Sequence, residues 1–436
     1  MKVVVLGAGI IGVCTAWHLL ERGHEVTVVD REPDAALETS FANAAQISVS
    51  YCEPWAYKGA PLKILKWMFR DDAPLLFKPH LDWQQWRWGL QFLAQCNDAA
   101  FARNVAQIVA LGAYSHAALK DVVAATGIEF QRLERGIGHY FTDQASFDGA
   151  AHAAQLMRQH GIERRVVSRD ELLAIEPALR PFSERIVGGT YTASDESGDA
   201  RLFTQALARR CAQRGARMLF GRSVQRIEVA GGAVASVAIS AGSAAASASN
   251  DMHLRADAVV VACGAYSAPL LRAVGVDLPI YPGKGYSATF PILRPEAAPS
   301  VSMIDDAVKC AMSRLGPALR VAGTIELNGF DSALDTPLAR ARCRMLAERV
   351  EAVYPGVCDT RTEEQGGTPN FWTGLRPATP TNIPYIGRTR IDKLWVNAGH
   401  GTLGWTHGAG SGKAMAELIS GEAAPIAGFR FSGGGA

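Results

Sequence analysis

The residues with the clearest chemical purpose are three glycines near the N-terminus, Gly7, Gly9 and Gly12, in the pattern G-A-G-I-I-G. The pattern joins a short apolar run to a helix-period segment, and a second β-branched run then ends in Asp30. In such a unit the first glycine permits the tight turn, the second lets the backbone approach a pyrophosphate, and the third lets the helix pack on the strand. The helix start offers free N–H groups to phosphates, and Asp30 can accept hydrogen bonds from ribose hydroxyls. The sequence therefore predicts a dinucleotide site here.

A signal peptide or membrane anchor is the competing interpretation of this N-terminus, because residues 3–20 carry no charged side chain and follow Lys2. A polar break at 21–24 and another strand-like run at 26–29 fit neither. There is also no small-x-small cleavage site. We therefore expect a cytoplasmic chain whose first residues form part of the fold.

A second candidate is the glycine-rich connection N-A-G-H-G-T-L-G-W-T-H-G-A-G-S-G-K, which runs from Asn397 to Lys413. A strand is expected before it, over 394–398, and a helix within and after it, over 410–420. A glycine-rich strand-to-helix turn directs N–H groups and a helix dipole at one point, which suits the N1–C2=O edge of a flavin. The alternative is a loop whose glycines only satisfy positive φ angles. Paired with the N-terminal unit, the turn favours a flavin cofactor.

Polar side chains at three further places could act on a substrate. Arg376 lies between an aromatic residue and prolines in W-T-G-L-R-P-A-T-P, where a guanidinium could bind a carboxylate through two hydrogen bonds. The alternative is a solvated surface arginine. Tyr286, with Lys284 and Ser287, offers a hydroxyl near a strand start, although an ordinary turn explains the pattern as well. His400 lies inside the glycine-rich turn and could face a flavin, or it could be a core histidine.

The composition excludes several other classes of protein. The 436 residues carry a formal net charge of +2, which leaves no basic excess for nucleic acid binding. The eight cysteines are scattered without a C-x-x-C pair or clustered histidines, so we expect reduced thiols, no disulfide framework and no metal site. A chain of this length is expected to form two domains.

The order of expected elements indicates an α/β fold with an inserted α+β part. Helices are predicted over 99–126, 148–160, 201–214 and 337–353, and a pair of short strands over 128–141. Three strand-like runs, 217–220, 224–229 and 234–239, form a β-meander before a buried strand at 258–262, an order typical of flavin-binding folds. We predict a discontinuous Rossmann-type FAD-binding domain and a second domain with a mixed sheet that binds the substrate. The ranges are 1–60, 145–275 and 371–436 for the first, and 61–144 and 276–370 for the second.

Five of the nine tryptophans fall within residues 51–92, among prolines and lysines. Tryptophans with interspersed lysines favour the interfacial zone of a membrane. The alternative, which we prefer from the sequence, is packing within the substrate domain.

Several motifs together make the chain resemble the D-amino acid dehydrogenase small subunits, within the D-amino acid oxidase superfamily of FAD-dependent enzymes. The resemblance covers nearly the whole chain. It rests on E-T-S-F-A-N-A (38–44), P-L-K-I-L-K-W-M-F (61–69), D-E-S-G-D-A-R-L-F-T (195–204), K-G-Y-S (284–287), W-T-G-L-R-P-A-T-P (372–380) and N-A-G-H-G-T-L-G-W-T (397–406).

The resemblance implies non-covalent FAD and oxidative deamination of D-amino acids, small apolar ones such as D-alanine included, to 2-oxo acids and ammonia. The α-hydrogen would leave as hydride to flavin N5, and electrons would pass to a quinone or another respiratory-chain acceptor. It also implies peripheral contact with the inner face of the cytoplasmic membrane. Arg376 would bind the substrate carboxylate, with Tyr286 and His400 as further catalytic candidates. The cofactor would contact Gly7, Gly9, Ile10, Ile11, Gly12, Asp30, Arg31, Ser40, Ala42, Asn43, Ala44, Gln46, Val224, Gly264, Gly399, Gly401, Thr402 and Leu403.

Two related functions remain open at the level of sequence. The same arginine and flavin would serve an enzyme for cyclic or N-methylated amino acids, of the hydroxy-D-proline or sarcosine type. A non-catalytic flavoprotein subunit that relays electrons is the other alternative. The chain also departs from the family pattern at Ala45, often glycine, at 381–383, where Thr-Asn-Ile replaces Asp-Gly-Thr, and at 407–409, where His-Gly-Ala replaces an apolar run.

Overall fold

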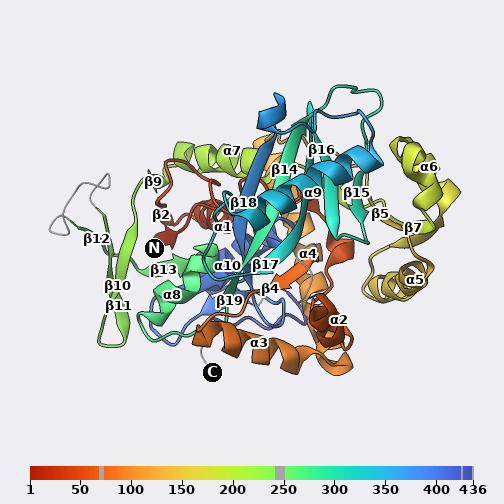
Figure 1. Ribbon diagram of the computed structural model, residues 1–436. Helices are drawn as coiled ribbons and strands as arrows, with labels where there is room; N and C mark the ends of the chain where they lie inside the picture. The colour runs from red at the N-terminus through yellow and green to blue at the C-terminus, as the bar shows by residue number, and fades with distance from the viewer. Residues whose placement is uncertain (68–72, 241–250, 424–425, 435–436) are drawn as a thin grey trace.

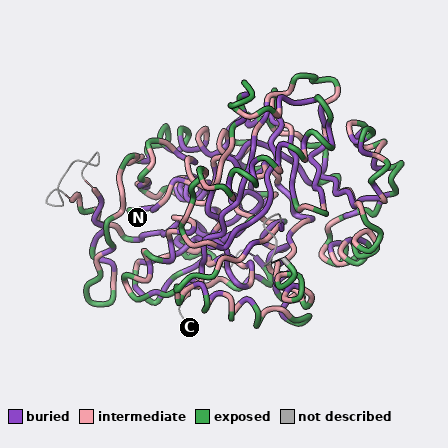
Figure 2. The backbone as a smooth tube through the Cα atoms, viewed as in Figure 1, coloured by how far each residue is buried: buried purple, intermediate pink, exposed green. Residues whose placement is uncertain are grey.

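The computed structural model describes residues 1–67, 73–240, 251–423 and 426–434. Two large β-sheets dominate it, each covered by helices (Figure 1). Buried segments concentrate in these sheets and in the helices between them, while α3, α5 and α6 lie at the periphery (Figure 2). This arrangement confirms the predicted α/β fold with a second, mixed sheet. The last two residues of the motif over 61–69 lie outside the described residues.

The first sheet has six strands in the order β19-β20-β13-β1-β2-β9. The four pairings from β20 to β9 are parallel, and only the edge strand β19 is antiparallel. β1 and β13 are continuous apolar runs because a central parallel strand is covered on both faces. The bounds are β1 Lys2–Leu6, β2 Glu25–Val29, β9 Arg217–Leu219, β13 Ala258–Val261, β19 Tyr385–Arg388 and β20 Leu394–Ala398.

One face of the first sheet carries helices that share its largest apolar core, and the other face packs against a small antiparallel sheet. The expected meander is wrong in one strand. β9 pairs with β2 rather than with β10, because helix α7 returns the chain parallel to β2, and β12 completes the small sheet instead. The helices of the largest core are α1 Ile10–Glu21, α4 Asp98–Thr126, α7 Ala200–Gln213 and α10 Gly404–Ile419. The core on the other face includes residues of the short helix α8 Ser267–Arg272 and of the small sheet, which consists of β10 Val224–Ala230, β11 Ala233–Ile239 and β12 Met252–Leu254.

The second sheet has nine strands, with the main order β18-β14-β17-β16-β15-β5-β7-β6 and β4 paired to β17. Helix α9 covers one of its faces, where a second apolar core forms (Figure 1). The strands are β4 Leu75–Phe77, β5 Ile137–Phe141, β6 Arg165–Ser168, β7 Gly188–Thr192, β14 Tyr281–Pro291, β15 Ser302–Asp305, β16 Cys310–Leu315, β17 Ala318–Leu327 and β18 Asn370–Ala378. The remaining elements are β3 Gln46–Ile47, β8 Glu196–Ser197, α2 Ala60–Trp67, α3 Trp83–Gln95, α5 Gln144–Gln159, α6 Arg169–Ile175 and α9 Pro337–Val353.

The pairing of three strands differs from the predicted division of the chain. β6, β7 and β18 fall in ranges expected to belong to the FAD-binding domain, yet all three pair in the second sheet. β18 pairs along almost the whole of β14, and β7 pairs with β5 after the helical excursion through α5 and α6. The range 128–141 forms one strand, β5, rather than two.

Helix α10 begins at Gly404, six residues before the expected start at 410. The later glycines of the connection therefore lie inside a helix, where a close approach explains them. A Cβ on Gly408 would lie 2.7 Å from Ile10 Cγ1, one on Gly410 2.5 Å from Ser115 Cα, and one on Gly412 2.5 Å from the Cys14 carbonyl carbon. These glycines let α10 pack directly on α1 and α4, as small residues do at other helix contacts.

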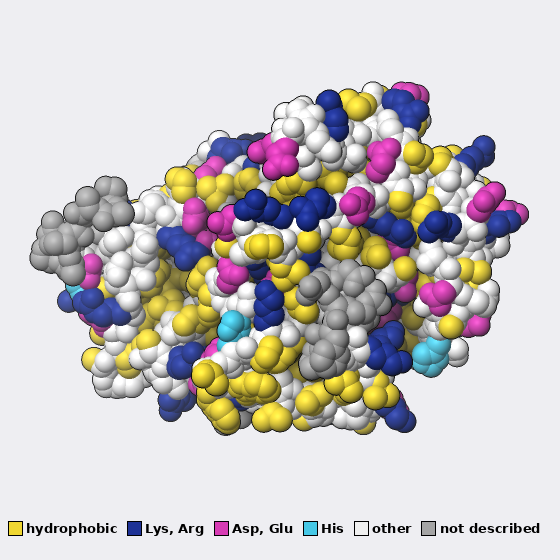
Figure 3. All heavy atoms as spheres, in the orientation of Figure 1, with side chains coloured by type: hydrophobic (Ala, Val, Ile, Leu, Met, Phe, Trp, Pro, Cys, Tyr) yellow, Lys and Arg dark blue, Asp and Glu magenta, His cyan; other side chains and the backbone are white. Residues whose placement is uncertain are grey.

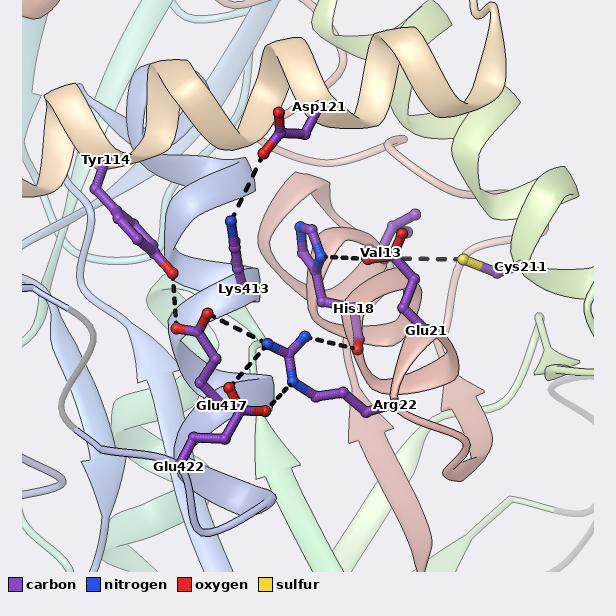
Figure 4. Close-up of polar contacts among 10 residues, drawn as sticks. All are labelled: Val13, His18, Glu21, Arg22, Tyr114, Asp121, Cys211, Lys413, Glu417 and Glu422. Carbon is purple, nitrogen blue, oxygen red and sulfur yellow. Dashed lines mark hydrogen bonds and ion pairs between the residues drawn. The ribbon is translucent and has the colours of Figure 1, made fainter.

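A cluster of polar contacts connects the ends of α1 and α10 to the middle of α4 (Figure 4). Arg22, at the end of α1, pairs with Glu417 of α10 at 3.2 Å and with Glu422 at 2.6 Å. Tyr114 of α4 donates to Glu417 at 2.6 Å. The bonds tie the N-terminal βα unit to the last helix of the chain.

One helix among the described residues, α4, has the length and apolar composition of a membrane span. It packs along α10 and belongs to the first core, so its composition reflects burial within the protein.

Candidate active site

A cavity of about 1480 Å³ is lined by residues of both large sheets. Its walls include nineteen of the twenty-one residues predicted as catalytic or cofactor-binding, and lack only Gly12 and Gly399. The cavity runs from the glycine turn after β1 to Arg376 and on toward the loops beside α5. The predicted residues in its walls are Gly7, Gly9, Ile10, Ile11, Asp30, Arg31, Ser40, Ala42, Asn43, Ala44, Gln46, Val224, Gly264, Tyr286, Arg376, His400, Gly401, Thr402 and Leu403.

The turn between β1 and α1 is shaped by glycines that no other residue could replace without moving backbone. Gly7 has φ of +103°, and a Cβ there would lie 2.5 Å from the Ala262 carbonyl oxygen. A Cβ on Gly12 would lie 1.9 Å from the Gly7 carbonyl oxygen, so Gly12 stands behind the turn and outside the cavity. The open turn leaves the start of α1 facing the cavity, as a cradle for a pyrophosphate requires.

Acidic and basic side chains border this end of the cavity. Asp30 accepts hydrogen bonds from the backbone N–H of Ala8 at 2.5 Å and of Glu32 at 2.9 Å, and burial raises the pKa of its carboxyl group. Arg31 pairs with Glu38 and lies over the Tyr266 ring at 4.2 Å. The Asp30 carboxylate at the end of β2, in the cavity wall, is where the ribose of a dinucleotide is bound in this type of fold.

The loop from Ser40 to Gln46 crosses from the first sheet to the second. Ser40 accepts a hydrogen bond from the N–H of Ile10 at 3.1 Å, at the start of α1. At the other end, Gln46 donates to Ser302 at 2.8 Å, and Ser313 donates to the carbonyl of Ala44 at 2.9 Å. The middle of the cavity is therefore walled by a loop held at both ends.

The turn before α10 forms the opposite wall. Gly399 and Gly401 have φ of +91° and +53°, and the N–H of Gly401 donates to the Pro377 carbonyl at 2.9 Å. A Cβ on Gly399 would lie 2.7 Å from Thr379 Cγ2, so this residue supports the turn from outside the cavity. The turn and the N-terminus of α10 face the cavity between the cradle and Arg376.

Arg376, on β18, is half-buried, and its side chain extends over the neighbouring strand β14. Its Nη1 donates to the Thr324 carbonyl oxygen at 2.7 Å. Burial lowers the pKa of Arg376 to about 10, so the side chain keeps its charge at neutral pH. In the described part of the chain no carboxylate pairs with it. A cation that faces a cavity with spare donors is suited to an anionic group of a ligand.

Two residues that hold Arg376 were missed from the sequence. Gly285 of β14 leaves the space for the guanidinium, since a Cβ there would lie 2.3 Å from Arg376 Cζ. Thr324 sits at a register shift between β14 and β17 with φ of +53°, a conformation rarely adopted by β-branched residues. Strain of this kind gathers at functional sites, and here it turns a carbonyl toward Arg376. A glycine in a strand is a weak signal of close approach, and nothing in the sequence indicates the bulge.

Tyr286 lines the cavity, but its hydroxyl is already hydrogen-bonded to a carboxylate, so its catalytic role stays a prediction. It donates to Glu326 at 2.7 Å, and Glu326 also pairs with Lys78 at 3.0 Å. The ring packs in the core beneath α9, and burial together with Glu326 raises the pKa of the Tyr286 hydroxyl. Lys284 is buried on the same strand and donates to the Ala333 carbonyl at 2.6 Å. Alternate residues of a strand face opposite sides, which explains why Gly285, and not its neighbours, lies beside Arg376.

His400 lines the cavity and bonds to α10. Its Nε2 lies 2.9 Å from Ser411 Oγ, and burial holds the pKa of the imidazole well below its ordinary value. Burial likewise lowers the pKa of His407, to about 3. Both rings are therefore neutral, and His400 fastens the glycine turn to the helix that follows.

Metal ligation finds no support in the described residues, which contain no cluster of three or more histidine, cysteine or acidic side chains. All eight cysteines are free thiols, and six of them are buried.

Comparison with known proteins supports a flavin site. The model of the FAD-dependent oxidoreductase family DAO matches residues 2–418. A D-amino acid dehydrogenase of Dechloromonas aromatica is 47% identical over 421 residues, which cover 97% of both chains. One of Cereibacter sphaeroides is 44% identical over 426 residues, covering 98% of this chain and 93% of the relative. The resemblance stated from the sequence is thereby confirmed.

Solved structures show the same fold at low sequence identity. Glycine oxidase from Bacillus cereus superposes with a TM-score of 0.71 at 22% identity, over 96% of this chain and 95% of that one. L-proline dehydrogenase from P. horikoshii gives 0.72 at 16% identity, over 98% and 95%. The family match over almost the whole length, with the cradle and the cavity it opens into, shows that this chain belongs to the FAD-dependent oxidoreductases of the DAO family.

Proposed function

We propose that this enzyme oxidises D-amino acids to 2-oxo acids and ammonia. One observation carries the proposal: the guanidinium of Arg376, which pairs with no carboxylate in the described part of the chain, lines the same cavity as the dinucleotide cradle. An amino acid always brings a carboxylate, and a rigid guanidinium binds that group through two parallel hydrogen bonds. The name shared by the close relatives, D-amino acid dehydrogenase, supports this choice of substrate.

The residues around the cavity divide the work of binding FAD. Gly7, Gly9 and the N–H groups at the start of α1 would hold the pyrophosphate, and Asp30 the ribose. The loop 40–46 and the turn 401–403 would enclose the flavin ring from two sides. These contacts are non-covalent. When bound, FAD accepts the hydride that leaves the α-carbon of the substrate.

Arg376 contributes by positioning. Its bond to the Thr324 carbonyl and the space above Gly285 fix the guanidinium before the substrate arrives. With the carboxylate bound there, the α-carbon hydrogen can be directed at the flavin, and positioning of this kind supplies much of the rate enhancement. The amino group must be neutral to react, and the imine then reacts with water. His400 is neutral and engaged with Ser411, so we assign no general base.

We also propose that the chain is organised as a discontinuous FAD-binding domain, built on the first sheet, and a substrate domain built on the second. The two faces of the cavity support this division, because the cradle comes from the first sheet and Arg376 from the second.

We propose peripheral contact with the inner face of the cytoplasmic membrane, where a quinone can serve as the electron acceptor. An exposed apolar stripe on α3 supports this contact. Trp83, Trp86, Leu90 and Leu93 recur at helical spacing and are 68%, 46%, 62% and 50% exposed, while Trp88 on the opposite face is buried. Hydrophobic side chains gather along the lower edge of the molecule, where α3 lies (Figure 3). Tryptophan and leucine in this arrangement suit the interfacial zone of a bilayer.

Trp86 also packs edge-on against Phe77 of β4, so the packing preferred from the sequence holds for part of its ring, whereas Trp83 is 68% exposed. Sedimentation with anionic vesicles tests the contact: we expect binding by the protein and its loss in a Trp83→Ser, Trp86→Ser variant. Equal binding by the two proteins would contradict the contact.

Anaerobic mixing with a panel of amino acids tests the reaction itself. We expect bleaching of the flavin absorbance with D-alanine and other D-amino acids, and none with their L-enantiomers. Bleaching by cyclic or N-methylated amino acids alone would move the assignment to the related chemistry. A flavin that no amine bleaches would instead indicate an electron relay.

A further inference from the structure

Beyond Arg376, the cavity continues to a second polar region, which we call the charged end. It consists of Tyr51, Glu53, Arg164, Asp306 and Lys309, all of which line the cavity. They come from the segment before α2, from the start of β6 and from the loop between β15 and β16. None of them belongs to the cofactor cradle, and among the described residues none is hydrogen-bonded to Arg376.

The charges in this region balance. Arg164 is buried and bonds to Glu53 at 2.9 Å, and it also bonds to the Ser50 carbonyl at 3.3 Å and to Thr190 at 3.2 Å. Lys309 bonds to Asp306 at 2.5 Å. These four groups therefore stand in two pairs of opposite charge, whose own net charge is zero.

A buried histidine lies under the charged end. His139 is 1% exposed, and neither ring nitrogen has a partner among the described residues. Tyr51 packs edge-on against it, with ring centroids 4.7 Å apart. Burial, with Arg164 and Lys309 nearby, holds the pKa of His139 well below its ordinary value, so the ring adds no charge.

The charged end lies within reach of a substrate bound at Arg376. Arg376 bonds to Thr324, and the adjacent Gly323 pairs with Cys310. The carbonyl oxygen of Lys309 lies 2.9 Å from the place of a Cβ on Gly323. Neighbouring strands are about 4.8 Å apart, so the charged end begins roughly one to two strand spacings from the guanidinium. The bound carboxylate, the α-carbon and a side chain of three or four bonds together span that distance.

The floor between the two places is apolar and small. Ala322 pairs with Ala311, Ala311 with Ile304, and Ile304 with His139, which makes one continuous row across four strands. The three apolar members of the row line the cavity. An extended side chain can therefore lie along this floor.

We propose that the charged end binds the distal group of the substrate side chain and selects neutral, hydrogen-bonding groups, a carboxamide above all. The proposal rests on the proposed oxidation of D-amino acids. A carboxylate could bind Arg164 or Lys309 only by competing with Glu53 or Asp306, and an ammonium could bind these acids only by competing with the two cations, so either ion would leave a like charge without its partner. An apolar group would displace water from the four charged side chains and could not replace the hydrogen bonds that this water makes to them. An amide supplies donors and an acceptor together.

Three substrates of equal shape test the selection. D-glutamine, D-glutamate and the apolar isostere D-homoleucine differ only in the distal group, and D-alanine serves as the reference that does not reach it. We expect kcat/KM for D-glutamine to exceed that of both isosteres by about tenfold, since a site built to hydrogen-bond rejects an analogue that cannot. Equal values for D-glutamine and D-homoleucine would overturn the proposal.

Two variants separate a binding role from a structural one. Lys309→Met should lower the ratio of D-glutamine to D-homoleucine by about tenfold, whereas Lys120→Met, on the exposed face of α4, should leave it unchanged. Glu53→Gln keeps a hydrogen-bonding partner for Arg164 and gives the cluster a net positive charge. It should raise kcat/KM for D-glutamate relative to D-glutamine by about tenfold, a gain that lost packing cannot produce.

The outcomes distinguish this inference from the function on which it rests. If D-alanine is oxidised while both variants keep the wild-type ratios, the charged end does not bind the side chain and only this inference fails. If no D-amino acid reduces the flavin, the proposed function fails, and the inference fails with it.

Discussion

The cradle around Gly7 and the platform around Arg376 form two ends of one cavity, but they are built in different ways. The cradle comes from a single contiguous βα unit and would contact its ligand largely through backbone atoms. Its shape depends on glycines at which a Cβ would collide with other backbone atoms. The platform joins residues of three strands, and its geometry depends on where the Arg376 side chain extends between Gly285 and Thr324. A change in the cradle therefore disturbs the fold, whereas a change in the platform can alter the substrate and leave the fold intact.

The largest expected effect follows from Gly12→Ala in the cradle. The new Cβ would lie 1.9 Å from the Gly7 carbonyl oxygen, and backbone cannot give way as a flexible side chain can. We expect loss of FAD and a destabilisation of about 3 kcal/mol, measured as the flavin-to-protein ratio and by urea unfolding.

Gly89→Ala is the matched control for that experiment. Gly89 lies within α3 with nothing within 4 Å of its Cβ position, so alanine should leave FAD bound and stabilise the helix by up to about 1 kcal/mol. If Gly12→Ala retains stoichiometric FAD and wild-type stability, the cradle does not depend on that close approach.

The next largest effect is expected at the platform, where a substitution should lower kcat/KM strongly and change the free energy of unfolding little. In Gly285→Ala the Cβ would lie 2.3 Å from Arg376 Cζ, and the guanidinium is the part that can move. We expect kcat/KM for D-alanine to fall by about 100-fold with FAD fully bound, because the carboxylate loses its charge-assisted partner. Steady-state kinetics beside the Gly89→Ala control measure this. If Gly285→Ala also loses FAD, the cradle and the platform depend on each other, and the comparison fails.

Sequence reasoning succeeded where function depends on local pattern. The cradle is contiguous, and each of its glycines has one conformational or packing reason that can be stated without the fold. Arg376 was chosen because its rigid, aromatic and proline-rich setting is encoded beside it; it does line the cavity, and its role in binding a carboxylate stays a proposal. The motifs also indicated FAD, which the family match confirms.

The failures share a different physical origin, namely contacts between residues distant in the chain. The strand of Tyr286 was expected, but the face to which its side chain points depends on pairing with β17 and β18. The bulge at Thr324 shifts that register and leaves no trace in the sequence. The glycines of α10 were taken for a longer turn because their neighbours, Ile10, Ser115 and Cys14, lie about 300 to 400 positions earlier.

A smaller effect, on stability, is expected from three buried neutral histidines: His139 under the charged end, His400 in the turn before α10, and His407 within α10. Burial lowers the pKa of each, so below the ordinary value of about 6.5 the unfolded chain binds protons that the folded chain does not. The free energy of unfolding should therefore fall as the pH drops below about 6.5, by up to about 1.4 kcal/mol per pH unit for each histidine.

Urea unfolding of the holoprotein between about pH 5 and 7.5 measures that slope. His139→Gln and His407→Gln should each remove about one histidine's share of the slope, which compares a position on the second sheet with one in α10. A slope that is unchanged in both variants would contradict the assignment of these rings as neutral.

The smallest effect is expected at Ala45, where the family often has glycine. Ala45 has φ of +59°, a conformation that costs an L-residue about 1–2 kcal/mol, and glycine adopts it freely. Because glycine also gains entropy in the unfolded chain, we expect Ala45→Gly to stabilise the protein by no more than about 1 kcal/mol. Ala44 does not have a positive φ, so Ala44→Gly should destabilise the protein. Thermal unfolding of the two variants measures the difference.

The most direct test of the account is the anaerobic rate of flavin bleaching by D-alanine in an Arg376→Lys variant. Lysine retains the charge but cannot form the paired hydrogen bonds of a guanidinium. We predict that FAD stays bound and that the substrate concentration for half-maximal rate rises by about 100-fold. A half-maximal concentration and rate equal to those of the wild type would contradict the assignment of Arg376 as the carboxylate site.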